Sequence, residues 1–364
     1  MILGVDASRA VGDRTGVGRN VVYLLRGWAG QDAPFEHIRV FTPAPLDDVP
    51  ADPRIGVEVL PGRGGGLLWQ ATSLRRAAAD VDVLLGHYSL PPAWSGRGVV
   101  YNLGILGGRH RLHGLRTRAR ARHFRESARR AEVVIANSES TKADLVRFYG
   151  LDPEQVEVVW PGAAPEFRPA RPGDEEATAD ALERTLGVRD APFLLFVGKL
   201  SARRNVPALI DAFVAVRESH PDLRLLFVGP NTAGVEIRDL GGAVRHIEFL
   251  DHDLLAPLYR GARAFVLPTE QEGFSHTIPE AIASGCPVVT AEHAALGDAG
   301  LRASVLVVPE PTPTLLAHAI GQVLDDDELR DRLIRAGLET GKTLTWDETA
   351  RRTMAILARV ATRA

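Results

Sequence analysis

Two carboxylates, Glu272 and Glu280, flank a short glycine-containing loop in the stretch TEQEGFSHTIPEAIASGCPVV (269–289). The pattern predicts a strand, then this loop, then a helix that ends at Gly285. The first turn of such a helix exposes backbone amides that can bind an anion. A carboxylate beside a bound phosphate would hold sugar hydroxyls, so these residue types suit a sugar nucleotide. The amides concerned are those of Ser275, His276, Thr277 and Ile278.

The same spacing has a purely structural interpretation. Thr277 as the N-cap and Glu280 at the third helical position would form a capping box. Glu280 would then only stabilise its own helix. The spacing alone leaves both interpretations open.

A second stretch, GKLSARRN (198–205), follows the apolar run FLLFV. It places Lys199 at the end of a predicted strand and Arg203 and Arg204 at the start of the next helix. Cations at a helix N-terminus oppose the helix dipole, and an anion bound between them would remove that conflict. The alternative is a solvated basic turn.

Short apolar runs alternate with amphipathic stretches, a pattern typical of a mostly parallel sheet with helices on both faces. The segment 161–191 interrupts this pattern with prolines, glycines and charges, and is interpreted as a linker and a first helix. The sequence LLFVG occurs twice in the second half of the chain, and each copy is a predicted strand that ends on glycine. A glycine at the end of a strand indicates that another group lies close to the backbone there. The predicted strands are 2–6, 37–41, 81–85, 98–102, 132–137, 156–160, 192–198, 223–229, 244–250, 263–268, 286–290 and 304–309.

Composition limits the class of protein. A chain of 364 residues predicts about two domains, and a net charge of −3 gives no general attraction to nucleic acid. The one cysteine, Cys286, excludes an internal disulfide. No signal peptide or membrane-spanning run is evident, so a cytoplasmic location is expected.

These motifs resemble those of the family 4 retaining glycosyltransferases. Glu272 and Glu280 match the E-x7-E motif, Gly198 to Asn205 match the phosphate loop, and EAIASGCPVV matches a helix and strand of the family. The similarity covers nearly the whole chain, and the segment 6–20 is similar to the first loop of bacterial mannosyl- and rhamnosyltransferases. The resemblance implies an α/β GT-B fold, with two doubly wound Rossmann-like domains facing across a cleft. The expected domains are 1–168, joined by a returning C-terminal helix at 347–364, and 169–346.

The resemblance also implies roles for individual residues. Lys199 and Arg204 would bind the donor diphosphate and stabilise the leaving group, although the family's Arg-then-Lys order is reversed here. Glu280 would hold the ribose and Glu272 the donor sugar. The remaining expected donor contacts are Gly16, Gly18, Gly198, Leu250 and the turn Ser275, His276, Thr277 and Ile278. The glycine spacing of the first loop does not fit a dinucleotide fingerprint, which argues against a dehydrogenase.

One departure concerns the acceptor side. The family's His-Asp pair is replaced by Asn102 and Leu103, and Asn102 can hydrogen-bond but cannot titrate. Asn102 remains a candidate catalytic and acceptor-side residue. His87 also follows a predicted strand and either lines the acceptor side or is a satisfied core histidine.

The implied activity is transfer of a hexose from a nucleotide sugar to a hydroxyl acceptor, with retention, by a front-face mechanism and without a metal or other cofactor. The acceptor would be a glycan, a lipid-linked molecule or a small molecule. The alternatives are an epimerase acting on nucleotide sugars, or a catalytically impaired homologue that binds a nucleotide sugar or a partner transferase.

The segment 109–130 contains nine arginines and one acidic residue, Glu126. As a helix it would present a cationic face to anionic lipid at the inner surface of the membrane. The alternative is a solvated helix in an arginine-rich protein.

Overall fold

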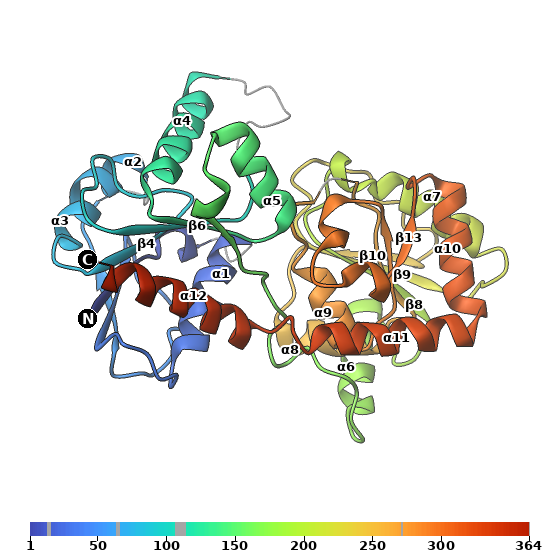
Figure 1. Ribbon diagram of the computed structural model, residues 1–364. Helices are drawn as coiled ribbons and strands as arrows, with labels where there is room; N and C mark the ends of the chain where they lie inside the picture. The colour runs from blue at the N-terminus through green and yellow to red at the C-terminus, as the bar shows by residue number, and fades with distance from the viewer. Residues whose placement is uncertain (13–15, 63–65, 106–113, 271, 364) are drawn as a thin grey trace. The chain divides into compact units, whose positions relative to one another are not determined.

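The computed structural model describes residues 1–364 except 13–15, 63–65, 106–113, 271 and 364 (Figure 1). The chain forms two compact units, Met1–Pro161 with Trp346–Ala364, and Gly162–Thr345. The first boundary lies between Pro161 and Gly162, whereas the sequence predicted that the first domain ends at residue 168. Ala163 already belongs to the second unit, because its amide donates to the Leu344 carbonyl at 2.8 Å.

The first unit contains a seven-stranded parallel sheet in the order β3-β2-β1-β4-β5-β6-β7. Six strands were predicted from their apolar runs, whereas β3 was missed because it is an edge strand whose residues are all exposed or only partly buried. The strands are β1 Ile2–Asp6, β2 His37–Thr42, β3 Ile55–Val59, β4 Val83–His87, β5 Gly98–Asn102, β6 Val133–Ala136 and β7 Val156–Val158.

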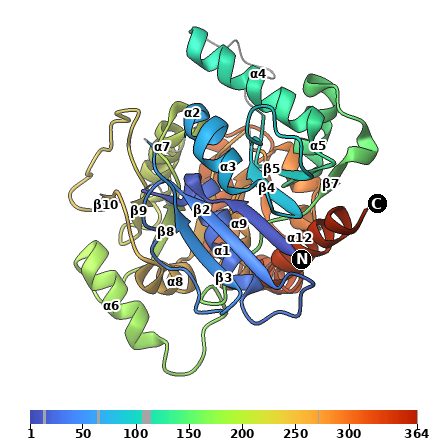
Figure 2. The ribbon, with the colours of Figure 1, turned by 90° about the vertical axis from the view of Figure 1, so that its left-hand side faces the viewer.

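Helices cover this sheet, and two core clusters of apolar side chains lie against it. The α-helices are α1 Val17–Trp28, α2 Leu67–Trp69, α3 Arg75–Ala77, α4 Leu115–Arg130, α5 Glu139–Asp144 and α12 Trp346–Thr362. Wider π-helical turns, η2 Gln70–Leu74 and η3 Leu145–Tyr149, continue α2 and α5, and a 3-10 turn lies at each of η1 Ser8–Ala10 and η4 Pro153–Gln155. The outer end of α4 projects from its unit in both views (Figures 1 and 2).

The last helix, α12, returns to the first unit and packs on α1, as the sequence predicted. The two helices approach closely, because a Cβ on Gly27 would lie 2.5 Å from the Cβ of Ala350. The Trp28 indole donates to the Ala350 carbonyl at 2.9 Å, and the rings of Tyr23 and Trp346 stack at 4.9 Å. Side chains of α12 therefore complete the hydrophobic core of the first unit.

Truncating Leu357 of α12 is expected to destabilise the first unit. Leu357 is fully buried in the core shared with α1, and Leu→Ala changes at such sites lower the free energy of unfolding by about 2–5 kcal/mol. Urea denaturation followed by tryptophan fluorescence measures this loss. Arg351→Ala, on the exposed face of the same helix, is the control, and equal midpoints for the two variants would contradict the packing described here.

The second unit contains a six-stranded parallel sheet in the order β10-β9-β8-β11-β12-β13. Its strands are β8 Phe193–Val197, β9 Arg224–Val228, β10 Val244–Ile247, β11 Ala264–Leu267, β12 Val288–Ala291 and β13 Leu306–Val308. Its α-helices are α6 Glu175–Leu186, α7 Val206–Val216, α8 His252–Gly261, α9 Thr277–Ala283, α10 Pro313–Asp325 and α11 Asp327–Gly341, with 3-10 turns η5 Ala202–Arg204, η6 Ala294–Gly297 and η7 Leu301–Ser304.

Each sheet has one point at which its strand order reverses. In the first unit this point lies between β1 and β4, and in the second it lies between β8 and β11. The loops that leave the carboxyl ends of the two strands diverge there, which is where open α/β sheets bind their ligands. The loops after β8 and β11 carry the two stretches that the sequence singled out.

Candidate functional site

The loop after β8 begins at Gly198, whose φ of +145° suits glycine alone. A Cβ at this position would lie 2.5 Å from Nη1 of Arg204, so the guanidinium packs directly on the backbone. A Cβ on Gly229, at the end of β9, would lie 2.2 Å from the Gly198 carbonyl oxygen. Both LLFVG glycines therefore stand at close backbone approaches, as predicted.

Arg204 is a largely buried cation, with 14% of its side chain exposed. Its Nη2 donates to Oε2 of Glu272 at 3.2 Å, and burial lowers the pKa of the guanidinium from its usual value. Its Nε and Nη1 are buried without a hydrogen-bond partner among the described residues. Unsatisfied buried donors are costly, so this guanidinium retains the capacity to bind an anion.

Asn205 joins the β8 loop to the β11 loop. In a left-handed conformation with φ of +46°, its side-chain amide donates to the Pro268 carbonyl at 2.9 Å and to Glu270 at 3.2 Å. Asn205 is also the N-cap of α7, so Arg203 and Arg204 precede that helix. They form the end of the 3-10 turn η5, which leads directly into α7, so they lie close to the predicted position at the start of that helix. Glu272 provides part of the counter-charge for Arg204.

Lys199 follows Gly198 directly and is exposed. It makes no ion pair with any residue that the structure describes. The β8 loop thus offers one free ammonium group and one buried guanidinium.

The loop after β11 leads into α9, which starts at Thr277. The N-cap position is taken by His276, whose side chain makes no capping hydrogen bond, while the Thr277 hydroxyl pairs with that of Ser275 at 2.8 Å. The capping-box interpretation, which has Thr277 as the N-cap, therefore does not fit this helix start. Glu280 is 1% exposed, and its carboxylate accepts a hydrogen bond from the buried Tyr259 hydroxyl of α8 at 3.3 Å.

The structure therefore brings several predicted donor-site residues to one edge of the second sheet. The ion pair between Arg204 and Glu272 joins the two loops directly. Leu250 lies in the loop after β10, which ends at Ile247 and not at 250 as predicted. Its neighbour Phe249, in the same loop, is an exposed aromatic residue with 68% of its surface accessible.

The predicted residues of the first unit lie at the carboxyl edge or near it. Gly16 is the N-cap of α1 with a φ of +47°, and Gly18 is buried in the first turn of that helix. Asn102 ends β5 and is fully buried, and its side-chain oxygen accepts from the Gly104 amide at 3.0 Å. Its Nδ2 is buried without a partner among the described residues.

His87 ends β4 and is 1% exposed. Its Nε2 lies 2.9 Å from the Asn20 side-chain oxygen, and its ring stacks on Tyr101 at 5.8 Å. Burial lowers the pKa of His87 to about 4, so the imidazole is neutral at pH 7. These contacts favour the core interpretation of His87, although its Nδ1 is buried without a hydrogen-bond partner among the described residues.

A polar network that sequence reasoning missed lies where the order of the first sheet reverses. Buried Asp6, at the end of β1, accepts from Nε2 of Gln70 at 2.8 Å. Gln70 also contacts Ser89 at 3.2 Å and His123 of α4 at 3.4 Å. Burial raises the pKa of Asp6 and lowers that of His123. The network links the sheet edge to the arginine-rich helix.

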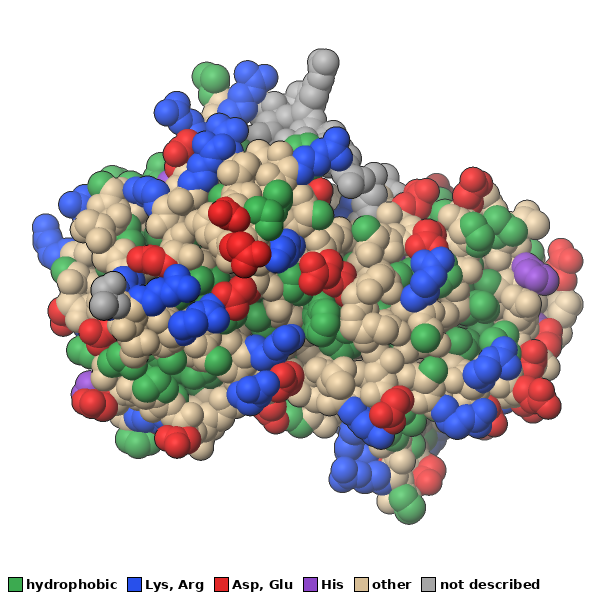
Figure 3. Space-filling view, in the orientation of Figure 1, with side chains coloured by type: hydrophobic (Ala, Val, Ile, Leu, Met, Phe, Trp, Pro, Cys, Tyr) green, Lys and Arg blue, Asp and Glu red, His purple; other side chains and the backbone are tan. Residues whose placement is uncertain are grey.

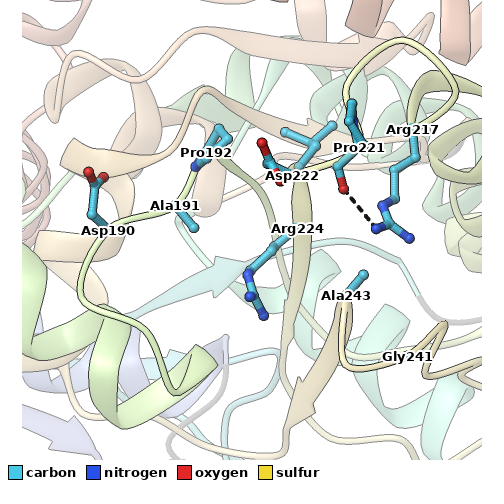
Figure 4. Close-up of a pocket in the computed structure, with 10 residues that line it drawn as sticks. Asp190, Ala191, Pro192, Arg217, Pro221, Asp222, Arg224, Gly241 and Ala243 are labelled. Atoms are coloured by element: carbon cyan, nitrogen blue, oxygen red, sulfur yellow. Dashed lines mark hydrogen bonds between the residues drawn. The ribbon is translucent and has the colours of Figure 1, made fainter.

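A surface pocket lies at the opposite edge of the second sheet, where β8, β9 and β10 begin (Figure 4). Two half-buried arginines line it, Arg217 and Arg224, which donate to the carbonyls of Pro221 and Gly242. No predicted site residue lines this pocket. The other residues around it are Asp190, Ala191, Pro192, Pro221, Asp222, Leu223, Gly241 and Ala243.

Comparison with known proteins identifies the family. Residues 14–167 match the model described as Glycosyltransferase Family 4, and residues 180–340 match that of Glycosyl transferases group 1. A D-inositol 3-phosphate glycosyltransferase of Corynebacterium efficiens is 31% identical over 303 residues, 76% of this chain and 70% of the relative. The chain belongs to the family 4 glycosyltransferases. A Thermomonospora curvata relative of the same name is 32% identical, over 62% of this chain and 56% of its own length.

Solved structures show that this glycosyltransferase has the GT-B fold. Sucrose-phosphate synthase from Thermosynechococcus elongatus superposes with a TM-score of 0.76 at 20% identity, covering 99% of both chains. WaaG, a glycosyltransferase of lipopolysaccharide biosynthesis, gives 0.76 at 17% identity, covering 98% of this chain and 99% of its own. Anabaena HepE in complex with UDP-glucose gives 0.74 at 17%, covering 98% of both. The predictions of fold and enzyme class are confirmed.

Proposed function

We propose that this glycosyltransferase transfers a hexose from a nucleoside diphosphate sugar to a hydroxyl acceptor, with retention of configuration. The observation that carries the proposal is Arg204, a buried guanidinium on the Gly198 backbone with two nitrogens that no described residue satisfies. The phosphate oxygens of a diphosphate would satisfy those donors, and Lys199 would add a second positive charge. Glu280 would then bind the ribose and Glu272 the sugar.

The departure of the nucleoside diphosphate is the demanding step, because negative charge grows on the β-phosphate. Arg204, Lys199 and the amides at 275–278 would stabilise that charge electrostatically. In a front-face mechanism the acceptor hydroxyl attacks from the side of the leaving phosphate, which takes its proton. The protein then supplies charge and position, and no protein nucleophile is required.

A thermal-shift screen tests the donor class. UDP-glucose is the first probe, because a structural neighbour was solved with it, and GDP-, dTDP- and ADP-sugars complete the panel. At least one nucleotide sugar should raise the melting temperature, and the matching nucleoside should not. A panel without any shift would refute the proposed donor class.

The names of the relatives support a small polyol phosphate as one acceptor. It can be assayed with the donor that the screen selects.

Transfer should not require a metal ion. Among the described residues, no group of three or more His, Cys, Asp or Glu side chains could hold one, and Lys199 and Arg204 would provide the positive charge at the proposed diphosphate. Treatment with EDTA is therefore expected to leave kcat unchanged. Activity lost on chelation and restored by Mg²⁺ or Mn²⁺ would contradict this mechanism.

The replacement of the family's His-Asp pair by Asn102 and Leu103 favours one second candidate, a catalytically impaired homologue. Asn102 is buried and its oxygen is engaged with the Gly104 amide, so its part in handling the acceptor would be limited. Donor binding without turnover across a broad acceptor panel would support this candidate. Isomerisation of the donor without an acceptor would instead support an epimerase.

The arginines of α4 support contact with anionic membrane. Its projecting half carries exposed Arg116, Arg118, Arg120 and Arg122, and Leu115 at its start is 82% exposed (Figure 3). An arginine-rich helix with an exposed apolar end binds anionic lipid surfaces. No helix within the described residues is long and apolar enough to cross a bilayer.

Vesicles containing anionic lipid should therefore bind the protein in a salt-dependent way. Flotation with phosphatidylglycerol vesicles measures this, and neutral phosphatidylcholine vesicles are the control. The double variant Arg120→Glu with Arg122→Glu should lose most of the binding, since each basic residue near such a surface contributes about 1 kcal/mol. Equal flotation with both vesicle types would contradict the proposed contact.

A further inference from the structure

Two residues in the described part of the chain each leave two buried side-chain nitrogens without a hydrogen-bond partner, Arg204 and His293. Native structures satisfy most buried polar atoms, because an unpaired one costs free energy. For Arg204 the proposed diphosphate provides the missing partner. His293 requires a separate explanation, because both of its ring nitrogens are affected and its side chain is 5% exposed.

His293 lies at the same sheet edge as Arg204. It follows β12, which pairs with β11 in the register Leu267 to Thr290, and β11 pairs in turn with β8. β11 lies between β8 and β12 in the sheet, and the fully buried Thr269 follows it. The Thr269 hydroxyl also has no hydrogen-bond partner among the described residues. Adjacent strands lie about 4.8 Å apart, so the ends of β8 and β12 are separated by roughly 10 Å.

The ring chemistry of His293 indicates what kind of group it would bind. Burial lowers its pKa to about 4, so the ring is neutral at pH 7, with one nitrogen donating and the other accepting. A sugar hydroxyl both donates and accepts, whereas an ionised phosphate only accepts. The nearest charged neighbour in sequence, Glu292, is already engaged by two hydrogen bonds from Arg302 at 2.7 Å each.

We propose that His293 binds a hydroxyl of the donor's glycosyl group and thereby extends the donor site from β8 across to β12. The proposal rests on the proposed function, because it presupposes that Arg204 holds the diphosphate of a nucleotide sugar. In this proposal His293 recognises the sugar, while the β8 loop and α9 bind the nucleotide. His293 would then help to determine which sugar is accepted.

Calorimetry with UDP and with UDP-glucose, or with the pair that the donor screen selects, tests the assignment. His293→Phe keeps a planar ring without nitrogens, and should weaken binding of the nucleotide sugar about tenfold, the scale of one hydrogen bond. Binding of the nucleoside diphosphate should stay within about twofold. His293→Gln, which can donate and accept, should recover part of the lost affinity, and His318→Leu, at an exposed site on α10, should change neither.

The melting temperature separates this role from a structural one. Because His293→Phe removes two unsatisfied buried nitrogens, its melting temperature should equal or exceed that of the wild type. Should phenylalanine not be accommodated, His293→Leu carries the same comparison. Equal loss of affinity for both ligands, or no loss for either, would overturn the assignment. Wild-type protein that binds neither ligand would refute the proposed function itself, a result distinct from a failure at His293.

Discussion

Replacing Arg204 with alanine is expected to lower kcat by about 10²–10³-fold, the usual cost of losing one electrostatic stabiliser of a transition state. The guanidinium rests on Gly198 and has two buried nitrogens that no described residue satisfies. Its removal would take away the charge that we propose stabilises the leaving phosphate, and would also break the ion pair with Glu272. Steady-state kinetics at saturating donor measures the effect.

Two further variants show whether the geometry of the guanidinium matters. Arg204→Lys keeps the charge but loses the planar fork, so its kcat should lie between those of the wild type and the alanine variant. Arg203→Ala removes the neighbouring exposed arginine and should change kcat by less than about threefold, as an exposed charge contributes little. If the variants at 203 and 204 were equally impaired, general positive charge and not the buried guanidinium would account for catalysis.

Replacing Glu280 with glutamine is expected to weaken donor binding by about 10–100-fold, with a smaller effect on kcat. Glu280 is 1% exposed and its carboxylate accepts a hydrogen bond from the Tyr259 hydroxyl, which would hold it in position for the proposed contact with ribose hydroxyls. A hydrogen bond to a charged group contributes about 1.5–3 kcal/mol, which sets the size of this effect. Calorimetric titration of the donor measures the dissociation constant.

Tyr259→Phe is the matched control for Glu280, because it removes the supporting hydrogen bond but leaves the carboxylate. Donor affinity should then fall less than in Glu280→Gln. A role confined to helix capping would give a different result, a lower melting temperature by the equivalent of about 1 kcal/mol with donor affinity intact. That outcome would remove Glu280 from the proposed donor site.

Most strands of the fold could be predicted from sequence because parallel strands are buried on both faces and appear as apolar runs. The exception, β3, lies at a sheet edge with residues that are exposed or only partly buried. The strand-terminal glycines were also predictable, since Gly198 and Gly229 occupy backbone conformations and close approaches that other residues do not tolerate.

The side-chain pairings of the site could not be predicted in the same way. The ion pair between Arg204 and Glu272 depends on two loops meeting across neighbouring strands, and local spacing contains no information on that contact. The hydrogen bond between Asp6 and Gln70 likewise joins residues from different elements. The sequence analysis treated Thr277 as the N-cap of α9, whereas Thr277 is the first residue of that helix. This shift of one residue is what made the spacing to Glu280 resemble a capping box.

The central claim is that the carboxyl edge of β8 and β11 binds a diphosphate. Calorimetry of the nucleoside diphosphate selected by the donor screen, against its nucleoside, tests this claim most directly in the wild type and in Arg204→Ala. The wild type should bind the diphosphate at least 100-fold more tightly than the nucleoside, and the substitution should remove most of that difference. Equal affinity for the two ligands, or a preference for the diphosphate that survives in Arg204→Ala, would contradict the claim.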